Sequence, residues 1–99
     1  MTPPIPHSAI WVEWNRAMAD MEQAKAGDPA GYERCAERFL ALYEEHAHLP
    51  ASPHALYNAA ECYKAAGDRK GLLLFRRLVR EHPESELANK ARQILAETD

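Results

Sequence analysis

Apolar residues recur at steps of three and four positions from Ile10 to Leu95, and no segment alternates apolar and polar residues. Such spacing puts the apolar side chains on one face of an α-helix, whereas a half-buried strand requires a period of two. Glycine and proline interrupt the pattern at Gly27, Pro50, Gly67 and Pro83. The chain is therefore predicted to be all-α, with about five helices whose short connections make consecutive helices pack antiparallel.

Local residue chemistry sets the predicted helix starts. An aspartate or serine accepts hydrogen bonds from the free amides at a helix start, and a following proline has no N–H to leave unpaired. The predicted starts are Asp28-Pro29, Ser52-Pro53, Asp68 and Ser85. The predicted helices span about residues 8–26, 29–48, 52–66, 68–82 and 85–97. Their predicted inward residues are Ile10, Trp11, Trp14, Met18, Met21, Tyr32, Cys35, Phe39, Leu42, Tyr43, Leu56, Ala59, Ala60, Tyr63, Leu72, Phe75, Leu78, Val79, Leu87, Ala88, Ala91, Ile94 and Leu95.

Length and composition limit the class of protein. Ninety-nine residues form one ordinary domain, and 46% hydrophobic with 27% charged residues is typical of a globular chain. The longest apolar run is LLLF at 72–75, so no membrane insertion is expected. Residues 1–7 are predicted to be a flexible proline-rich arm before a single domain at 8–99. Because this N-terminus has neither a basic start nor an apolar run, a cytoplasmic location is expected, or an envelope location if a leader is missing.

The charge distribution is mild. The net charge is −3, without the strongly basic field that nucleic-acid binding needs, so no nucleic-acid partner is expected. Arg76, Arg77 and Arg80 share one predicted helix face and form a candidate basic patch that could meet phosphate, acidic lipid or an acidic partner. A solvated outer face is the favoured alternative, because Glu81 and Glu84 dilute the field.

Two short fragments occur twice in the chain. Pro-x-Ser stands at 50–52 and again at 83–85, a spacing of 33 residues, and Gly-Asp stands at 27–28 and 67–68. A period in the thirties with two helices per period is typical of helical solenoids.

Residues 55–85, ALYNAAECYKAAGDRKGLLLFRRLVREHPES, resemble a tetratricopeptide repeat (TPR). The matching features are Leu56, Ala60, Tyr63, the Gly67-Asp68 turn, Leu72, Phe75 and Pro83. The ending FRRLVREHPESELANKARQIL is most similar to the subtype of bacterial envelope proteins, the TolA-binding and outer-membrane-assembly type. Residues 10–50 resemble a degenerate first repeat, with Trp14, Met18 and Met21 in place of Leu56, Ala60 and Tyr63.

The resemblance implies an antiparallel helix-pair solenoid of just over two repeats, at about 10–50 and 52–84, closed by a capping helix at 85–97. The first helices of the pairs would line a concave face that binds a peptide or a partner domain. The family's groove positions, carried over to this chain, are Asn15, Glu22, Tyr57, Glu61 and Lys64.

The chain departs from the TPR pattern at two places. Gly71 falls inside a predicted helix, where glycine costs about 1 kcal/mol relative to alanine. The interval from Gly-Asp to the proline of the next Pro-x-Ser is 22 residues in repeat one and 15 in repeat two. The second helix of repeat one is therefore expected to be about two turns longer than its counterpart.

Three histidines stand close together at 46, 48 and 54. His46 and His48 point away from each other on a helix, and metal ligation needs three or four converging ligands, so no metal site or other cofactor is predicted. Favourable interaction with the negative end of the helix that they finish is the favoured interpretation.

Cys35 and Cys62 are the two cysteines of the chain. Antiparallel packing of the second and third helices would bring them to within about two turns of the same level. A disulfide is open on this ground, but buried free thiols are favoured, because nothing in the sequence enforces the short distance between Cα atoms that a disulfide needs.

Trp11 and Trp14 stand near the N-terminus. Two indoles this close to a chain end are hard to bury together, so one is expected in the core and the other against the arm or a partner.

The sequence contains no glycine-rich phosphate loop, nucleophile motif or His-Glu-x-x-His, and no enzyme is predicted. The leading hypothesis is a protein-interaction module, a scaffold or adaptor, in a bacterial envelope or motility assembly. The alternative is a structural subunit that self-associates as a homo-oligomer, because two repeats are few for a solenoid. A minor alternative is a metal- or redox-responsive protein, based on the histidines and Cys35/Cys62.

Overall fold

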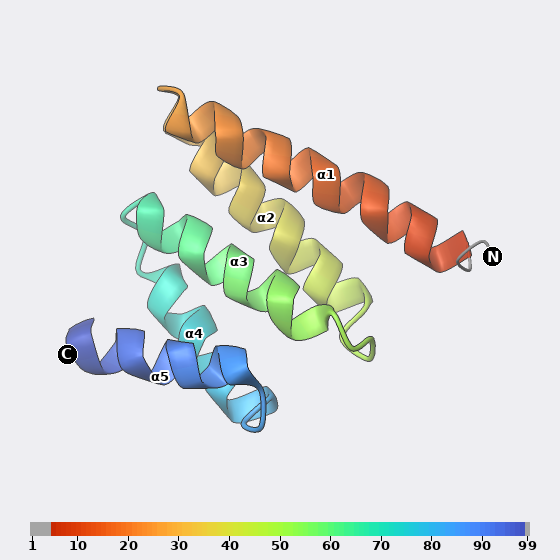
Figure 1. Cartoon of the computed structure of the whole chain (residues 1–99). Coiled ribbons are helices and arrows are strands. Elements are labelled where there is room, and N and C mark those ends of the chain that lie inside the picture. The colour runs from red at the N-terminus through yellow and green to blue at the C-terminus, as the bar shows by residue number, and fades with distance from the viewer. Residues whose placement is uncertain (1–4, 99) are drawn as a thin grey trace.

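The computed structural model describes the backbone of residues 5–98 and the side chains of residues 10–98. It contains five helices: α1 (Ile5–Lys25), α2 (Ala30–Glu45), α3 (Ser52–Ala65), α4 (Lys70–Glu81) and α5 (Glu86–Thr98) (Figure 1). No strand occurs in the described range, and the all-α prediction is confirmed. Residues 1–4 of the predicted arm lie outside the described residues, and 5–7 already belong to α1.

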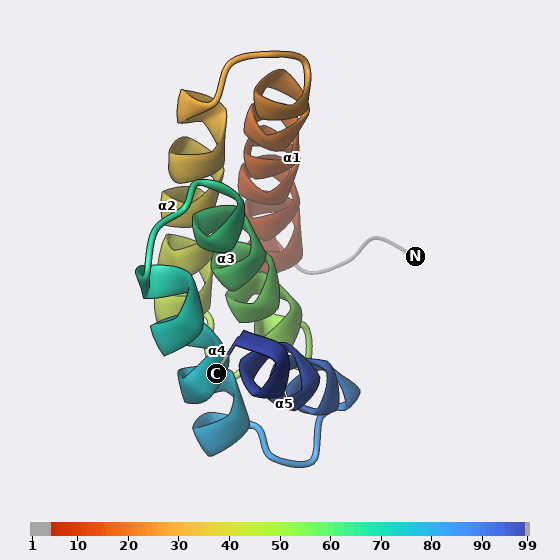
Figure 2. The ribbon, with the colours of Figure 1, turned by 90° about the vertical axis from the view of Figure 1, so that its left-hand side faces the viewer.

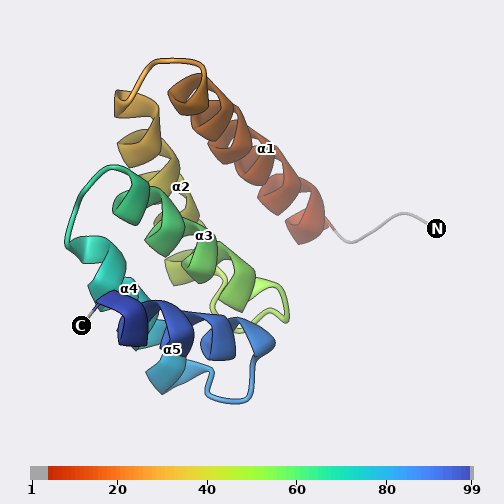
Figure 3. The ribbon, with the colours of Figure 1, turned by 60° about the vertical axis from the view of Figure 1, so that its left-hand side comes forward.

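The helices form two layers. In Figure 1, α1, α3 and α5 lie nearer the viewer than α2 and α4. The side view of Figure 2 shows the same separation, and the intermediate view of Figure 3 shows each helix following the last across a short connection. Consecutive helices pack on one another, and α3 also contacts α5. Helices α1 and α5 therefore lie at opposite ends of the stack (Figure 1).

The two Gly-Asp turns have the same backbone form but different caps. Gly27 and Gly67 have positive φ values, 128° and 77°, which suits the glycine that follows a helix. Asp68 accepts a hydrogen bond from the backbone N–H of Lys70, as predicted. Asp28 does not cap α2; its carboxylate accepts a hydrogen bond from Arg34 instead.

The two predicted serine caps also differ from each other. The Ser85 hydroxyl accepts a hydrogen bond from the Leu87 N–H, as expected of a cap. Ser52 is already the first residue of α3, and its hydroxyl donates to the Ala47 carbonyl at 2.8 Å. The prediction that Ser52 caps α3 was therefore wrong, because its hydroxyl holds the α2–α3 connection instead.

Two buried glycines set the closest helix crossings. A Cβ on Gly31 would lie 2.4 Å from the Asp20 backbone oxygen of α1, and a Cβ on Gly71 would lie 2.8 Å from the Ala60 oxygen of α3. Both stand at the start of an even-numbered helix, in the repeated fragment Gly-Asp-x-x-Gly at 27–31 and 67–71. The cost expected of Gly71 inside a helix is thus offset by close packing, which no larger residue permits.

The core follows the predicted pattern with one exception. Phe39, Tyr43, Leu56, Phe75 and Leu78 are fully buried, and the other predicted inward residues of α2 to α5 are buried or half-buried. On α1 the predicted residues are half-buried except Trp11, whose exposed fraction is 63%. Apolar spacing therefore located the core correctly, because each helix has one apolar face.

The length prediction for α2 was wrong. This helix has 16 residues against 12 in α4, about one turn more and not two. It ends at Glu45, and turns fill the gap before α3 with hydrogen bonds from the Leu49 N–H to His46 and from the Ser52 N–H to Leu49. His46 and His48 consequently lie after the last helical turn and not within it.

A disulfide joins α2 to α3. Cys35 and Cys62 are bonded, with Cα atoms 6.4 Å apart and a sequence separation of 27 positions. The interpretation as free thiols was wrong, because the crossing of α2 and α3 brings the two residues within bonding reach. The bond crosses the boundary between the two predicted repeats.

Candidate binding surfaces

An apolar pocket of about 460 Å³ lies where α1 faces the connection between α2 and α3. Ile10, Trp11 and Trp14 contribute one wall from α1. The remaining lining residues are Leu42, His46, Leu49, Pro50, Ala51, Ser52 and Ala55. Ligand pockets in proteins have volumes of roughly 300–1,000 Å³, so this pocket can accept one large apolar side chain or a small apolar group.

The two tryptophans have different roles at this pocket. Trp14 packs edge-on against Phe39 of α2, with ring centroids 4.9 Å apart, and so holds α1 on the core. Trp11 stands one turn earlier at the pocket's rim and is largely exposed. The expectation that only one indole enters the core is therefore confirmed. An exposed tryptophan beside an apolar pocket is typical of a contact site for another molecule.

The pocket offers few polar groups. The Ser52 hydroxyl is already used by the Ala47 carbonyl, and His46 has its Nε2 3.8 Å from the Glu45 carboxylate. A molecule bound here would thus be held mainly by apolar contact, with His46 and the tryptophan N–H groups as the side-chain groups that can form hydrogen bonds.

The groove residues carried over from the TPR resemblance lie on α1 and α3. Tyr57, Glu61 and Lys64 follow one another at helical spacing on α3, and Asn15 and Glu22 lie two turns apart on α1. Among the described side chains, neither Asn15 nor Glu22 forms a hydrogen bond or ion pair with α3.

Tyr57 is the most constrained of these groove residues. Its ring packs edge-on against Phe75, with centroids 5.7 Å apart, and the ring is half-buried. Burial raises the pKa of its hydroxyl, and the negative charge of Glu61 raises it further. Tyr57 therefore offers a rigid ring edge with a neutral hydroxyl at physiological pH.

A second hollow, between α1 and α2, is lined mainly by charged residues, of which Glu13, Arg34 and Arg38 form ion pairs between these helices. The Asp20 carboxylate, only 13% exposed, accepts a hydrogen bond from Arg38 at 2.7 Å and lies 3.5 Å from Arg34. Arg38 also reaches Glu13 at 3.4 Å, and Arg34 pairs with Asp28 at 2.9 Å. This network joins the two helices and engages both arginines of the hollow.

A third cluster links the C-terminal ends of α2 and α4. The Tyr43 hydroxyl donates to the Glu81 carboxylate, and Nε2 of His82 lies 2.8 Å from the same hydroxyl oxygen. The Arg77 guanidinium lies over the Tyr43 ring, 4.9 Å from its centroid, and pairs with both Glu44 and Glu81. Of the candidate basic patch, Arg77 thus belongs to the contact between helices.

The Tyr43 cluster should make the free energy of unfolding depend on pH. Burial raises the pKa of Tyr43 to about 12, and the hydrogen bond to Glu81 adds to this. Because the folded pKa exceeds the unfolded value near 10, the stabilising contribution is complete below pH 10 and is lost as the pH rises to 12. We expect the difference in unfolding free energy between wild type and Tyr43→Phe to shrink by about 2 kcal/mol between pH 10 and 12. Urea titrations of both proteins at each pH measure this difference in unfolding free energy. A difference that stays constant up to pH 12 would contradict the raised pKa of Tyr43.

The histidines do not converge on a metal-binding arrangement. Within residues 10–98, no group of three or more His, Cys, Asp or Glu side chains is placed to hold a metal ion. His46, which lines the apolar pocket, is the one with a place in a candidate site. Among the described residues, no helix is long and apolar enough to cross a membrane.

Sequence reasoning missed the part of the pocket that does not come from α1. Leu49, Pro50 and Ala51 line it, although they had been interpreted only as a joint between helices. The nearby tryptophan pair was the sequence signal for this pocket, but no local pattern indicates which connection between helices the pair faces.

Comparison of the chain with models of known protein families, with curated proteins and with solved structures gives no significant match.

Proposed function

We propose that the chain is a protein-interaction module of the TPR type, which binds a peptide or a partner domain on the layer formed by α1, α3 and α5. Three features support the proposal: the antiparallel helices, their arrangement in two layers, and the Gly-Asp-x-x-Gly fragment at two equivalent helix crossings. The groove residues from the TPR resemblance, Asn15, Glu22, Tyr57, Glu61 and Lys64, lie on α1 and α3 of this layer.

The observation that carries the proposal is the largely exposed Trp11 beside the apolar pocket. A leucine or phenylalanine side chain of the partner enters the pocket, and Trp11 covers it. Full burial of such a side chain is worth about 1.5–3 kcal/mol, which is enough to anchor a short segment. Tyr57, Glu61 and Lys64 then contact the partner's flanking residues and select its charge.

Peptides selected from a random library on the immobilised protein provide the test. We expect them to share a large apolar residue and to lose about tenfold or more in affinity against Trp11→Ala, because buried aromatic anchors dominate such contacts. Val12→Ala is the matched control, because Val12 is also exposed and adjacent in sequence but does not line the pocket. In a Trp14→Phe background, Trp11 is the one remaining indole, and its fluorescence should shift to shorter wavelength on binding.

Different outcomes separate the pocket from the groove. Equal binding by wild type and Trp11→Ala would rule out the pocket, and equal binding by Tyr57→Ala/Lys64→Glu would rule out the predicted groove residues. Failure to select any peptide would count against the module as a whole. Sedimentation over a concentration range addresses the alternative, because self-association through Trp11 would give a dimer that Trp11→Ala abolishes.

A further inference from the structure

We propose that the outer face of α4 is a second docking surface, which binds an acidic segment of a partner protein. Arg69, Leu73, Arg76 and Arg80 stand at i, i+4, i+7 and i+11, so their side chains leave the helix in nearly one direction. All four are exposed, and Leu73 is 60% exposed in the middle of the row. We call these residues the arginine row.

The charges near the arginine row leave it positive. Glu81 is the only acidic residue of α4, and it is held by the Tyr43 hydroxyl and by Arg77 at 3.0 Å. Glu44 of the neighbouring α2 also pairs with Arg77. The hydrogen bond from Tyr43, together with Arg77, lowers the pKa of Glu81, so that it stays charged and neutralised within this cluster.

Two members of the row, Arg69 and Arg80, therefore keep most of their charge available. Arg80 reaches Glu81 only at 3.8 Å, which is too long for a strong hydrogen bond. Among the described residues, the Arg69 side chain has no ion pair, hydrogen bond or ring contact. Asp68 caps the start of α4 through the Lys70 N–H, and Glu84 stands three residues after the end of the helix.

An acidic protein segment fits this surface better than a membrane. A helix that lies in a bilayer surface buries a wide apolar face, but the apolar side chains of α4, such as Phe75 and Leu78, are buried in the core. Only Leu73 is left to meet apolar groups. A guanidinium binds carboxylates through two parallel hydrogen bonds, and an apolar residue between carboxylates matches Leu73.

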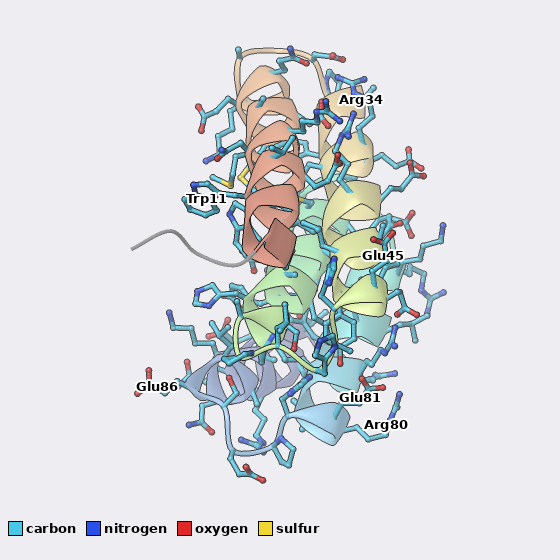
Figure 4. The ribbon with its side chains drawn as sticks, turned by 90° about the vertical axis from the view of Figure 1, so that its right-hand side faces the viewer. Trp11, Arg34, Glu45, Arg80, Glu81 and Glu86 are labelled. Carbon is cyan, nitrogen blue, oxygen red and sulfur yellow. A yellow bond between two sulfur atoms is a disulfide. The ribbon has the colours of Figure 1, made fainter. Side chains whose placement is uncertain are left out.

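Arg80 of the arginine row and Trp11 lie on different sides of the molecule (Figure 4). Figure 4 shows Arg80 directed outward from the α2 and α4 side and Trp11 on the α1 side. A ligand on one surface therefore leaves the other open. The proposed acidic segment is a partner in addition to the one at the pocket, so one chain can join two others.

The test uses a helical peptide in which one leucine is flanked by glutamates three and four residues away on both sides. We expect the peptide to bind, and the affinity to fall about tenfold both in Arg69→Gln/Arg80→Gln and in Leu73→Ser. Lys25→Gln/Lys90→Gln removes the same charge from exposed sites elsewhere and should bind like wild type. Circular dichroism confirms that each variant keeps its helices.

Three results would overturn the proposal. The first is equal binding of a peptide with lysines in place of the glutamates. The second is an equal loss in the Lys25→Gln/Lys90→Gln control, which would indicate non-specific attraction between net charges. The third is binding to vesicles with 30% phosphatidylserine or to polyuridylate RNA without binding of the acidic peptide, which would assign the row to lipid or nucleic acid.

Discussion

Replacing both cysteines by alanine, Cys35→Ala/Cys62→Ala, is expected to lower the unfolding free energy by about 3.5 kcal/mol. The disulfide closes a loop of 27 residues between α2 and α3, so its loss gives the unfolded chain more conformational freedom. Both side chains are buried, so the loss of two sulfur atoms from the core adds to the cost. Urea unfolding of the oxidised wild type and of the double variant measures the difference.

Two controls make the disulfide prediction specific. Wild type under reducing agent should unfold near the midpoint of the double variant, because both lack the same cross-link. The unreduced protein, unfolded in urea, should show no free thiol. Two free thiols, or equal stability of wild type and the double variant, would contradict the pairing of Cys35 with Cys62.

Disulfides persist mainly in oxidising compartments, so this pairing weighs against the cytoplasmic location expected from the N-terminus.

Gly31→Ala is expected to destabilise the protein by about 2 kcal/mol, although alanine is the better helix former. The Cβ of an alanine at position 31 would lie 2.4 Å from the Asp20 backbone oxygen and 3.0 Å from the Ala24 Cβ. Backbone atoms cannot move aside as a flexible side chain can, so α1 and α2 must separate. Gly71→Ala should act in the same direction, because its new Cβ would meet the Ala60 oxygen and the Lys64 nitrogen, each at 2.8 Å.

The sign of the glycine effect distinguishes two explanations. If these glycines were ordinary helix positions, alanine would stabilise each helix by about 1 kcal/mol. Ala30→Gly, at the exposed neighbouring position, is the matched control and should cost about 1 kcal/mol through helix propensity alone. Thermal and urea unfolding of the three variants measure these changes. An increase in stability for Gly31→Ala would show that the crossing of α1 and α2 is looser than described.

Local sequence chemistry predicted most of the fold. Helix order, the terminators Gly27 and Gly67, and the buried faces with Phe39 and Leu56 followed from apolar spacing and cap residues, each of which acts within a few positions along the chain. Most errors in the helix assignment were at helix ends, where a neighbouring group competed. Asp28 pairs with Arg34 and does not cap α2.

The candidate sites were predicted less completely. The exposure of one tryptophan was predicted because two indoles near a chain end are hard to bury together. The pocket, however, also needs Leu49 and Pro50 from the connection between α2 and α3. The arginine row was only partly anticipated, since Arg77 turned out to bind Glu44 and Glu81. Leu73 was outside the prediction, because apolar spacing alone does not show which leucine of the run LLLF stays exposed.

The sequence by itself determined that this protein is all-α, where its helices begin and end to within a few residues, and which face of most of them is buried. Only the tertiary structure decided the bond between Cys35 and Cys62, the contacts that exclude a side chain at Gly31 and Gly71, and the pocket beside Trp11. The physical reason is that helix formation depends on residues three or four positions apart, whereas these features depend on the distance and angle at which separate helices cross.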